Sequence, residues 1–190
     1  VVDGKVEAQI IYSNHIAEHL DPKVAYLYID VGGGSTEITV FANGKIVDSQ
    51  SFNIGTIRML HNQVSRELWD GFKEWVKEKT RRYELMVAIG SGGNINKLIK
   101  MAGKKEDKPL AVNKLREMYE LLKMHTVEER ITHLGLNPDR ADVIVPAAKI
   151  FLTIMKSAGI DYIVVPQVGL SDGIVHLLYE NYKRQLTIGL

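Results

Sequence analysis

The hydrophobic pattern near the start of the chain changes from a continuous apolar run to strict alternation. Residues 24–31 are apolar and rich in strand formers, residues 36–42 alternate between apolar and polar, and three glycines separate the two segments. Asn43-Gly44 follows, a pair that favours a type I′ turn because both residues tolerate positive φ. Residues 45–52 then supply another strand. The pattern predicts an antiparallel meander of three strands.

Helical periodicity dominates the rest of the chain, with two further strands expected at residues 84–90 and 160–165. Helices are expected at residues 7–19, from Thr56 onward, at 66–82, 94–102 and 112–124, after Thr126 (in a capping box with Glu129), at 138–157 and at 169–183. Asn137-Pro138 is expected to start the helix at 138–157, and Gly159 to end it.

This order of elements predicts the fold class. Three antiparallel strands followed by helix, strand, helix, strand and helix is typical of the ribonuclease-H-like fold. We therefore expect a single α/β domain over residues 1–190. Its sheet would be mixed and five-stranded, with three antiparallel strands followed by two parallel ones, and helices would cover both faces.

Composition and charge exclude several classes of protein. The 190 residues carry 24 basic and 23 acidic side chains and no cysteine. The near balance of charge argues against a protein that adheres mainly to nucleic acid or to an anionic membrane, and the lack of cysteine excludes disulfide scaffolds and thiol chemistry. No apolar run approaches the roughly 20 residues of a membrane span. The default expectation is a soluble cytoplasmic domain. Because the sequence opens with Val1 and runs directly into a helix, we expect a fragment of a longer chain.

One segment, Asp30 to Glu37, combines two acids with a glycine turn. Glycines let backbone N–H groups approach an anion such as phosphate. The turn consists of Gly32, Gly33, Gly34 and Ser35. Asp30 and Glu37 stand on adjacent strands, where two carboxylates can hold a hydrated divalent cation against a phosphate. The alternative is an ordinary glycine hairpin in which Asp30 binds local amides.

A second glycine cluster lies where a strand ends and a helix begins. It consists of Gly90, Ser91, Gly92 and Gly93. Free N–H groups and the helix dipole both favour an anion or a nucleotide at such a junction. The alternative is a tight strand-to-helix turn. The cluster has neither the ending of a P-loop nor the spacing of a dinucleotide fingerprint.

Together these motifs resemble the exopolyphosphatase and guanosine pentaphosphate phosphohydrolase family, part of the sugar kinase, actin and heat-shock-protein superfamily. The resemblance also rests on residues 4–8 (GKVEA), 55–58 (GTIR), 140–142 (RAD) and 168–170 (VGL), and it covers essentially the whole chain in order. Members have two ribonuclease-H-like lobes with the active site between them. The resemblance implies that this chain is the second lobe, that residues 1–20 form the leading interlobe helix, and that a first lobe of the same protein completes the site.

The resemblance also implies roles for individual residues. Glu7 matches the family's general base, and Asp30 and Glu37 match the acids that position water and Mg²⁺. Gly32, Gly33, Gly34 and Ser35 match its phosphate loop, Arg58 matches a phosphate or structural contact, and Gly92 and Gly93 match a position used for the nucleotide in kinase relatives. Family members usually form homodimers.

The implied function is hydrolysis of a terminal phosphoanhydride in inorganic polyphosphate or guanosine pentaphosphate, and the isolated lobe is expected to be inactive. Three departures from the family pattern keep an alternative open, namely a non-catalytic module that binds these phosphates. The departures are Val6, Pro146-Ala147-Ala148 and Ser171-Asp172. The sequence does not choose between the two substrates.

Other clusters receive ordinary interpretations. His15 and His19 fit a zinc pattern, but they lie at a helix end and have no third ligand. The basic residues between Lys77 and Arg82 alternate with acids, which favours an exposed salt-bridged surface, whereas those between Lys97 and Lys105 are the better candidates for a polyanion path. Trp69, Phe72, Trp75 and Val76 form one helical stripe and are expected in the core or in a lobe contact.

Overall fold

The computed structural model describes residues 23–103 and 108–166. Its first three strands, β1 (Ala25–Val31), β2 (Thr36–Ala42) and β3 (Lys45–Phe52), form the predicted antiparallel meander. Both central residues of the turn between β2 and β3 have positive φ, at 53° for Asn43 and 69° for Gly44, as a type I′ turn requires. The expected helices at residues 7–19 and 169–183 lie outside the described residues.

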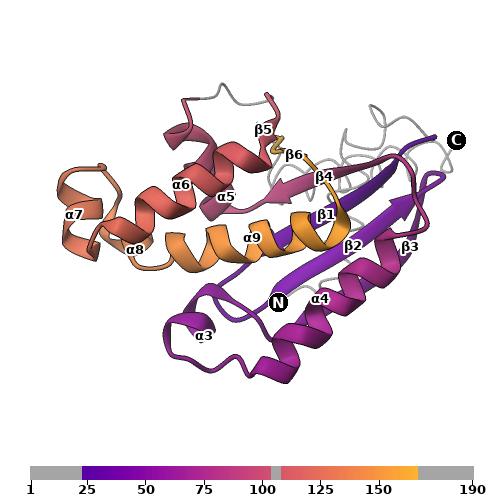
Figure 1. Cartoon of the computed structure of the whole chain (residues 1–190), viewed down its shortest axis with the longest axis horizontal. Helices are drawn as coiled ribbons and strands as arrows, with labels where there is room; N and C mark the ends of the chain where they lie inside the picture. The colour runs from indigo at the N-terminus through magenta and orange to yellow at the C-terminus, as the bar shows by residue number, and fades with distance from the viewer. Residues whose placement is uncertain (1–22, 104–107, 167–190) are drawn as a thin grey trace, which may run out of the picture.

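The sheet has six strands in the order β3-β2-β1-β4-β6-β5 (Figure 1). Strand β4 (Met86–Ser91) runs parallel to β1, and β6 (Tyr162–Val164) runs parallel to β4. The expectation of five strands is wrong because of β5 (Leu110–Ala111), which pairs antiparallel with β6 at the edge of the sheet. Two residues are too few to show any alternation of apolar and polar positions, so the sequence pattern could not reveal this strand.

A β-bulge interrupts the pairing of β2 with β3. Ala42 pairs with Lys45 and Phe41 with Ile46, but Val40 pairs with Asp48. One extra residue, Val47, is therefore accommodated on β3, and the pairs that join Thr36–Val40 to residues 48–52 are shifted by one position.

The described part of the chain contains seven helices. They are α3 (Thr56–Leu60), α4 (Arg66–Thr80), α5 (Gly93–Met101), α6 (Val112–Met124), α7 (Val127–Thr132), α8 (Pro138–Ala141) and α9 (Ile144–Ala158). The capping box before α7 is confirmed, because the Glu129 amide donates to Thr126 Oγ1 (3.2 Å) and the Thr126 amide donates to Glu129 Oε2 (2.8 Å). None of these helices combines the length and the apolar character that crossing a membrane demands.

The single long helix expected at residues 138–157 is wrong, because the segment divides into α8 and α9 at Asp142 and Val143. Pro146 explains the division. In a continuous helix it would have no N–H to donate to the Asp142 carbonyl, and its ring would clash with that carbonyl. Pro146 instead occupies the first turn of α9. Gly159, with φ of 68°, ends α9 as expected.

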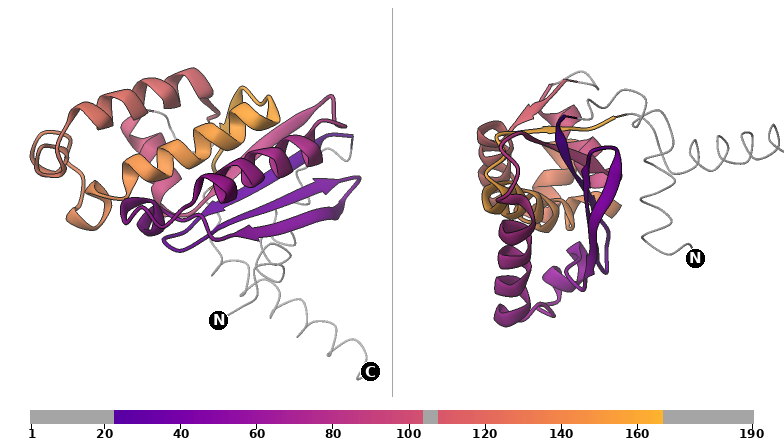
Figure 2. Two further views of the ribbon diagram at one scale, coloured as in Figure 1. Left: turned by 60° about the horizontal axis from the view of Figure 1, so that its bottom comes forward. Right: turned by 90° about the vertical axis from the view of Figure 1, so that its right-hand side faces the viewer.

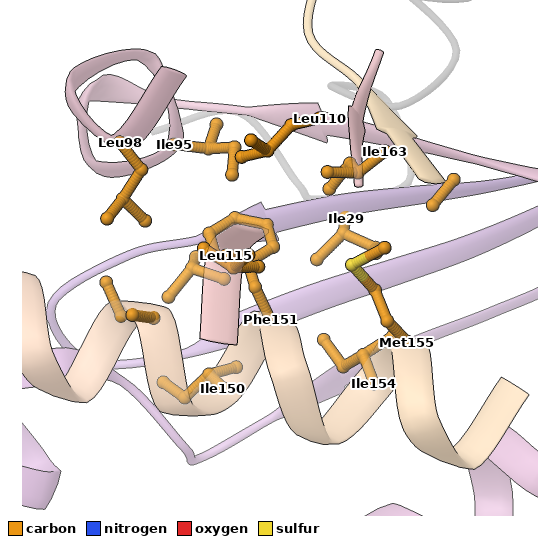
Figure 3. Packing of buried hydrophobic residues seen from close by; sticks show 14 of the residues in the cluster. Ile29, Ile95, Leu98, Leu110, Leu115, Ile150, Phe151, Ile154, Met155 and Ile163 are labelled. Atoms are coloured by element: carbon orange, nitrogen blue, oxygen red, sulfur yellow. The ribbon is translucent and has the colours of Figure 1, made fainter. Parts of the chain in front are cut away.

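Helices pack on one face of the sheet and form one continuous core. In the described ranges, α4, α5, α6 and α9 all contribute buried hydrophobic side chains to the cluster that includes Leu27, Ile29 and Val31 of β1. Figure 2 shows the helices together on this side of the sheet. In Figure 3, side chains of α9 such as Phe151 and Met155 point toward the sheet.

The other face of the sheet carries a smaller buried cluster. It consists of Tyr26, Tyr28, Phe41 and Ile89, and within residues 23–103 and 108–166 no helix contributes to it. Because the other two expected helices lie outside the described residues, helices on both faces stay a prediction.

Arg130 ties α7 to its neighbours from inside the protein. Its side chain is 9% exposed, with Nε donating to the Leu122 carbonyl (2.8 Å) and Nη1 to the Ala141 carbonyl (2.9 Å). Burial lowers the pKa of Arg130 from its ordinary value, and nearby Asp142 opposes that effect. The residue therefore fixes the end of α6 against α8.

We expect Arg130→Met to lower the free energy of unfolding by about 2–3 kcal/mol, because two charge-assisted hydrogen bonds to buried carbonyls are lost. Urea denaturation followed by circular dichroism measures the change. Arg116→Met is the matched control, since Arg116 is exposed on α6, and it should change the value by less than about 0.5 kcal/mol. Equal effects of the two substitutions would contradict a structural role for Arg130.

Candidate phosphate-binding site

Two carboxylates face each other at the end of the meander. Asp30 of β1 and Glu37 of β2 are direct register partners, and both are partly buried. Side chains of such partners lie on the same face of a sheet, with Cβ atoms about 4.5–5.5 Å apart. The same row continues to Ser51 of β3 and to Ser91 of β4. Four adjacent strands thus present two acids and two hydroxyls in one line.

Two serine hydroxyls hold the Glu37 carboxylate. Ser35 Oγ donates to Glu37 Oε1 at 2.6 Å, and Ser51 Oγ donates to the same oxygen at 2.9 Å. Hydrogen bonds to an ionised carboxylate are stronger than those between neutral groups. The carboxylate is therefore fixed from both sides of β2, by the turn before the strand and by β3 beside it.

The glycine turn between β1 and β2 accepts hydrogen bonds from α3 through its carbonyls. Four donors from α3 bind them: the Thr56 amide to Gly32 O (3.0 Å), the Ile57 and Arg58 amides to Gly33 O (2.9 and 3.4 Å) and Arg58 Nε to Gly34 O (2.8 Å). Among the described residues, the amides of Gly33, Gly34 and Ser35 have no hydrogen-bond acceptor. Successive unpaired N–H groups of this kind form an anion-binding concavity.

Gly55 allows the turn to approach α3 this closely. A Cβ atom on Gly55 would lie 2.2 Å from the Gly33 carbonyl oxygen, which is backbone and cannot move aside cheaply. The neighbouring Thr36 hydroxyl, which is buried, donates to the Ile54 carbonyl at 2.6 Å. The segment before α3 therefore sets the shape of the glycine turn.

The second glycine cluster contacts the first acid. Gly92, the residue before α5, has φ of 94° and ψ of 166°, a conformation that only glycine adopts readily. A Cβ atom on Gly92 would lie 3.0 Å from Asp30 Oδ1. The amino end of α5, which carries partial positive charge, thus lies beside the Asp30 carboxylate. The two motifs of the sequence form one site.

Arg140 is a site residue that sequence reasoning did not assign. A Cβ atom on Gly93 would lie 2.6 Å from Arg140 Nη2, and Arg140 Nη1 is 3.4 Å from Asn94 Oδ1. The guanidinium of α8 therefore covers the first turn of α5, where it adds a cation to the anion-favouring end of that helix. Its side chain is 38% exposed, which leaves it accessible from solvent.

A family model described as the Ppx/GppA phosphatase family matches residues 1–181. This chain belongs to the Ppx/GppA phosphatase family. The resemblance stated from the sequence is thereby confirmed.

Individual Ppx/GppA relatives agree with this assignment. The chain is 30% identical to a bifunctional 3-dehydroquinate synthase/phosphatase of Fusobacterium nucleatum, with 97% of this chain and 30% of that protein covered. It is 26% identical to exopolyphosphatase 2 of Mycobacterium tuberculosis, with 92% of this chain and 62% of that protein covered. The chain therefore spans less than two thirds of the length of these relatives.

Solved structures show the same fold. An exopolyphosphatase from Cytophaga hutchinsonii superposes with a TM-score of 0.76 at 21% identity, over 95% of this chain and 65% of that one. The prediction of a mixed α/β fold is confirmed, whereas the number and order of the strands differ from those expected.

One predicted site residue and two of the three departures are not described by the structure. Glu7, the proposed general base, lies outside the described residues, as do Val6 and Ser171-Asp172. The third departure, Pro146-Ala147-Ala148, is buried within α9, and Ala147 and Ala148 belong to the hydrophobic core. Arg58 contacts the turn through Gly34, which agrees with the structural role that the sequence left open.

Asp30 and Glu37 fit a Mg²⁺ site. Mg²⁺ is commonly bound through one or two carboxylates, with water and substrate phosphate completing its shell. The paired positions of the two acids beside the glycine turn suit that arrangement. Over residues 23–103 and 108–166, no group of three or more acidic, histidine or cysteine side chains offers a fuller site.

The expected salt-bridged surface is present around Asp48. Lys79 Nζ and Arg82 Nη2 lie 3.4 and 3.0 Å from its carboxylate. Phe72 and Val76 are fully buried, as the helical stripe predicted. In the other basic cluster, Lys97 Nζ donates to the Gly135 carbonyl (3.1 Å), while Lys104, Lys105 and the His15–His19 pattern lie outside the described residues.

Proposed function

We propose that this chain is the second lobe of a Ppx/GppA hydrolase that releases terminal phosphate from inorganic polyphosphate or guanosine pentaphosphate. The observation that carries the proposal is the pairing of Asp30 with Glu37 beside a turn in which the Gly33, Gly34 and Ser35 amides have no acceptor among the described residues. The names of the M. tuberculosis and C. hutchinsonii relatives, both exopolyphosphatases, support the substrate class. The proposal includes a first lobe of the same protein and a cytoplasmic location; a homodimer remains an expectation.

The proposed chemistry consists of positioning and charge neutralisation, which are what phosphoryl transfer mainly requires. The amides of Gly33, Gly34 and Ser35 would bind the terminal phosphate, and Arg140 would bind a further anionic group. Asp30 and Glu37 would hold Mg²⁺, which when bound supplies positive charge against the phosphoryl oxygens. Glu7 would accept a proton from the attacking water.

The first test is phosphate release by the full-length protein from medium-chain polyphosphate, guanosine pentaphosphate and ATP, each with Mg²⁺. We expect release from one of the first two substrates and little from ATP. Glu7→Gln should reduce that release by about 10²–10⁴-fold, because removing a general base has an effect of this size.

Equilibrium binding distinguishes the alternative function. If the wild-type full-length protein binds polyphosphate or guanosine pentaphosphate but releases no phosphate, it is a binding module and the hydrolase proposal is wrong. If release is normal in Glu7→Gln, the hydrolase stands but the role assigned to Glu7 does not.

A further inference from the structure

A residue of the edge strand β3 donates a hydrogen bond to one of the two acids. Ser51 is the register partner of Glu37, and its hydroxyl donates to Glu37 Oε1 at 2.9 Å. Neither a sequence motif nor the proposed mechanism uses this serine. Strand β3 lies at the edge of the sheet, beside β2 and not within either glycine turn (Figure 1).

Both hydroxyl donors to Glu37 contact the same oxygen. Ser35 and Ser51 bond to Oε1, while Oε2 has no hydrogen-bond donor among the described residues. This arrangement restricts the rotamer of a flexible side chain, whose ordering otherwise costs conformational entropy. It also leaves one oxygen available for a cation.

The two donors are not equivalent once a phosphate is bound. A serine hydroxyl has a single hydrogen, so it donates one hydrogen bond at a time. Ser35 belongs to the glycine turn, and when its hydroxyl donates to a phosphate it no longer donates to Glu37. Ser51 lies outside that turn and keeps its bond to Oε1.

The geometry points to Ser51 as a positioning residue that holds the Glu37 carboxylate in place while Ser35 donates to the substrate phosphate. This inference rests on the proposed function for the roles of Ser35 and Glu37, but it assigns Ser51 a task of its own. Ser51 touches neither the substrate nor the reacting atoms, and it acts through Glu37 alone.

The test measures cation binding directly as well as turnover. Mn²⁺, a paramagnetic substitute for Mg²⁺, is titrated into full-length Ser51→Ala and followed by electron paramagnetic resonance, with and without saturating orthophosphate. With orthophosphate we expect Mn²⁺ affinity to fall about tenfold, in the range found for residues that orient metal ligands. Without orthophosphate the loss should be about threefold or less, because Ser35 still donates to Glu37.

Steady-state kinetics provide a second readout. The Mg²⁺ concentration for half-maximal phosphate release should rise about tenfold in Ser51→Ala. KM for the phosphate substrate should stay within about twofold, because the glycine turn is untouched. Ser51→Thr retains the hydroxyl on a strand that favours β-branched residues and should restore wild-type behaviour.

Ser49→Ala is the matched control. Ser49 is two residues earlier on the same face of β3, and its hydroxyl pairs with Thr39 Oγ1 at 3.0 Å rather than with Glu37. If Ser51→Ala and Ser49→Ala give the same Mn²⁺ affinity and the same Mg²⁺ dependence, the inference is overturned. Thermal unfolding of both variants checks that the fold is intact.

Glu37→Gln separates this inference from the proposed function. If Glu37→Gln retains wild-type phosphate release, the proposed role of Glu37 fails, and the inference fails with it. If Glu37→Gln abolishes release while Ser51→Ala matches Ser49→Ala, the proposed function stands and only the role of Ser51 is wrong.

Discussion

Replacing Asp30 by asparagine is expected to reduce phosphate release by the full-length protein about 10²–10³-fold, the cost of removing one electrostatic contribution at a reacting phosphate. Asp30 is the register partner of Glu37, and its Oδ1 lies against Gly92 at the start of α5. Asparagine has nearly the same size and fits the same space. The substitution therefore removes negative charge and leaves the shape of both glycine turns intact. Initial rates of phosphate release, with thermal unfolding as a check on the fold, measure the effect.

Asp48→Asn is the control for this substitution. Asp48 is also a strand aspartate, but it pairs with Lys79 and Arg82 of the region around α4 rather than with the glycine turns. Loss of these partly exposed pairs should cost about 1 kcal/mol of stability and leave turnover unchanged. Comparable rates for Asp30→Asn and wild-type protein would refute the assignment of Asp30 to the site.

Replacing Gly55 by alanine is expected to lower the free energy of unfolding by about 3 kcal/mol or more, at the upper end of the cost of forcing atoms into a packed region. The added methyl would lie 2.2 Å from the Gly33 carbonyl oxygen and 2.5 Å from the Gly34 carbonyl carbon. This overlap is removed only if the glycine turn moves away from α3. That movement would break the bonds from the Thr56 and Ile57 amides, so phosphate binding should be lost together with stability.

Gly71→Ala is the matched substitution with the opposite expected sign. Gly71 lies within α4, and a Cβ atom there would meet no heavy atom within 4 Å. Alanine in a helix interior is favoured over glycine by about 0.5–1 kcal/mol. Urea denaturation should therefore show a large decrease in the free energy of unfolding for Gly55→Ala and a small increase for Gly71→Ala. A cost for Gly55→Ala below about 1 kcal/mol would show that the turn relaxes freely and that the close approach is not required.

The elements that the sequence predicted well are those with a local physical signal. Asn43-Gly44 specifies a turn through the φ angles of two residues, and the Thr126 capping box needs only four residues. Gly159 ends α9 because it adopts a left-handed conformation. Asp30 and Glu37 could be paired in advance because a short glycine turn joins their strands.

The contacts that were missed connect distant segments or depend on a local irregularity. Nothing in the spacing of Gly93 and Arg140 shows that the guanidinium covers the amino end of α5. Ser51 illustrates the second case. Counting back from a regular two-residue turn pairs Glu37 with Gln50, and only the bulge brings Ser51 opposite Glu37. The division between α8 and α9 could have been predicted from the sequence, because the clash of a proline ring with the carbonyl four residues earlier is a local effect.

The bulge also bears on how this part of the protein can change by insertion and deletion. Phe52 is the only residue of β3 that is buried in the core, whereas the residues before it are half-buried or exposed. A gain or loss of one residue near Val47 that shifts the register of β3 would replace the neighbour of Glu37 by the next residue along the strand, and within β3 it would take only Phe52 out of the core. A change in the length of the hairpin between β2 and β3 would therefore alter the surroundings of Glu37. The surroundings of Asp30, which does not pair with β3, would stay the same, and no substitution in the glycine turns would be needed.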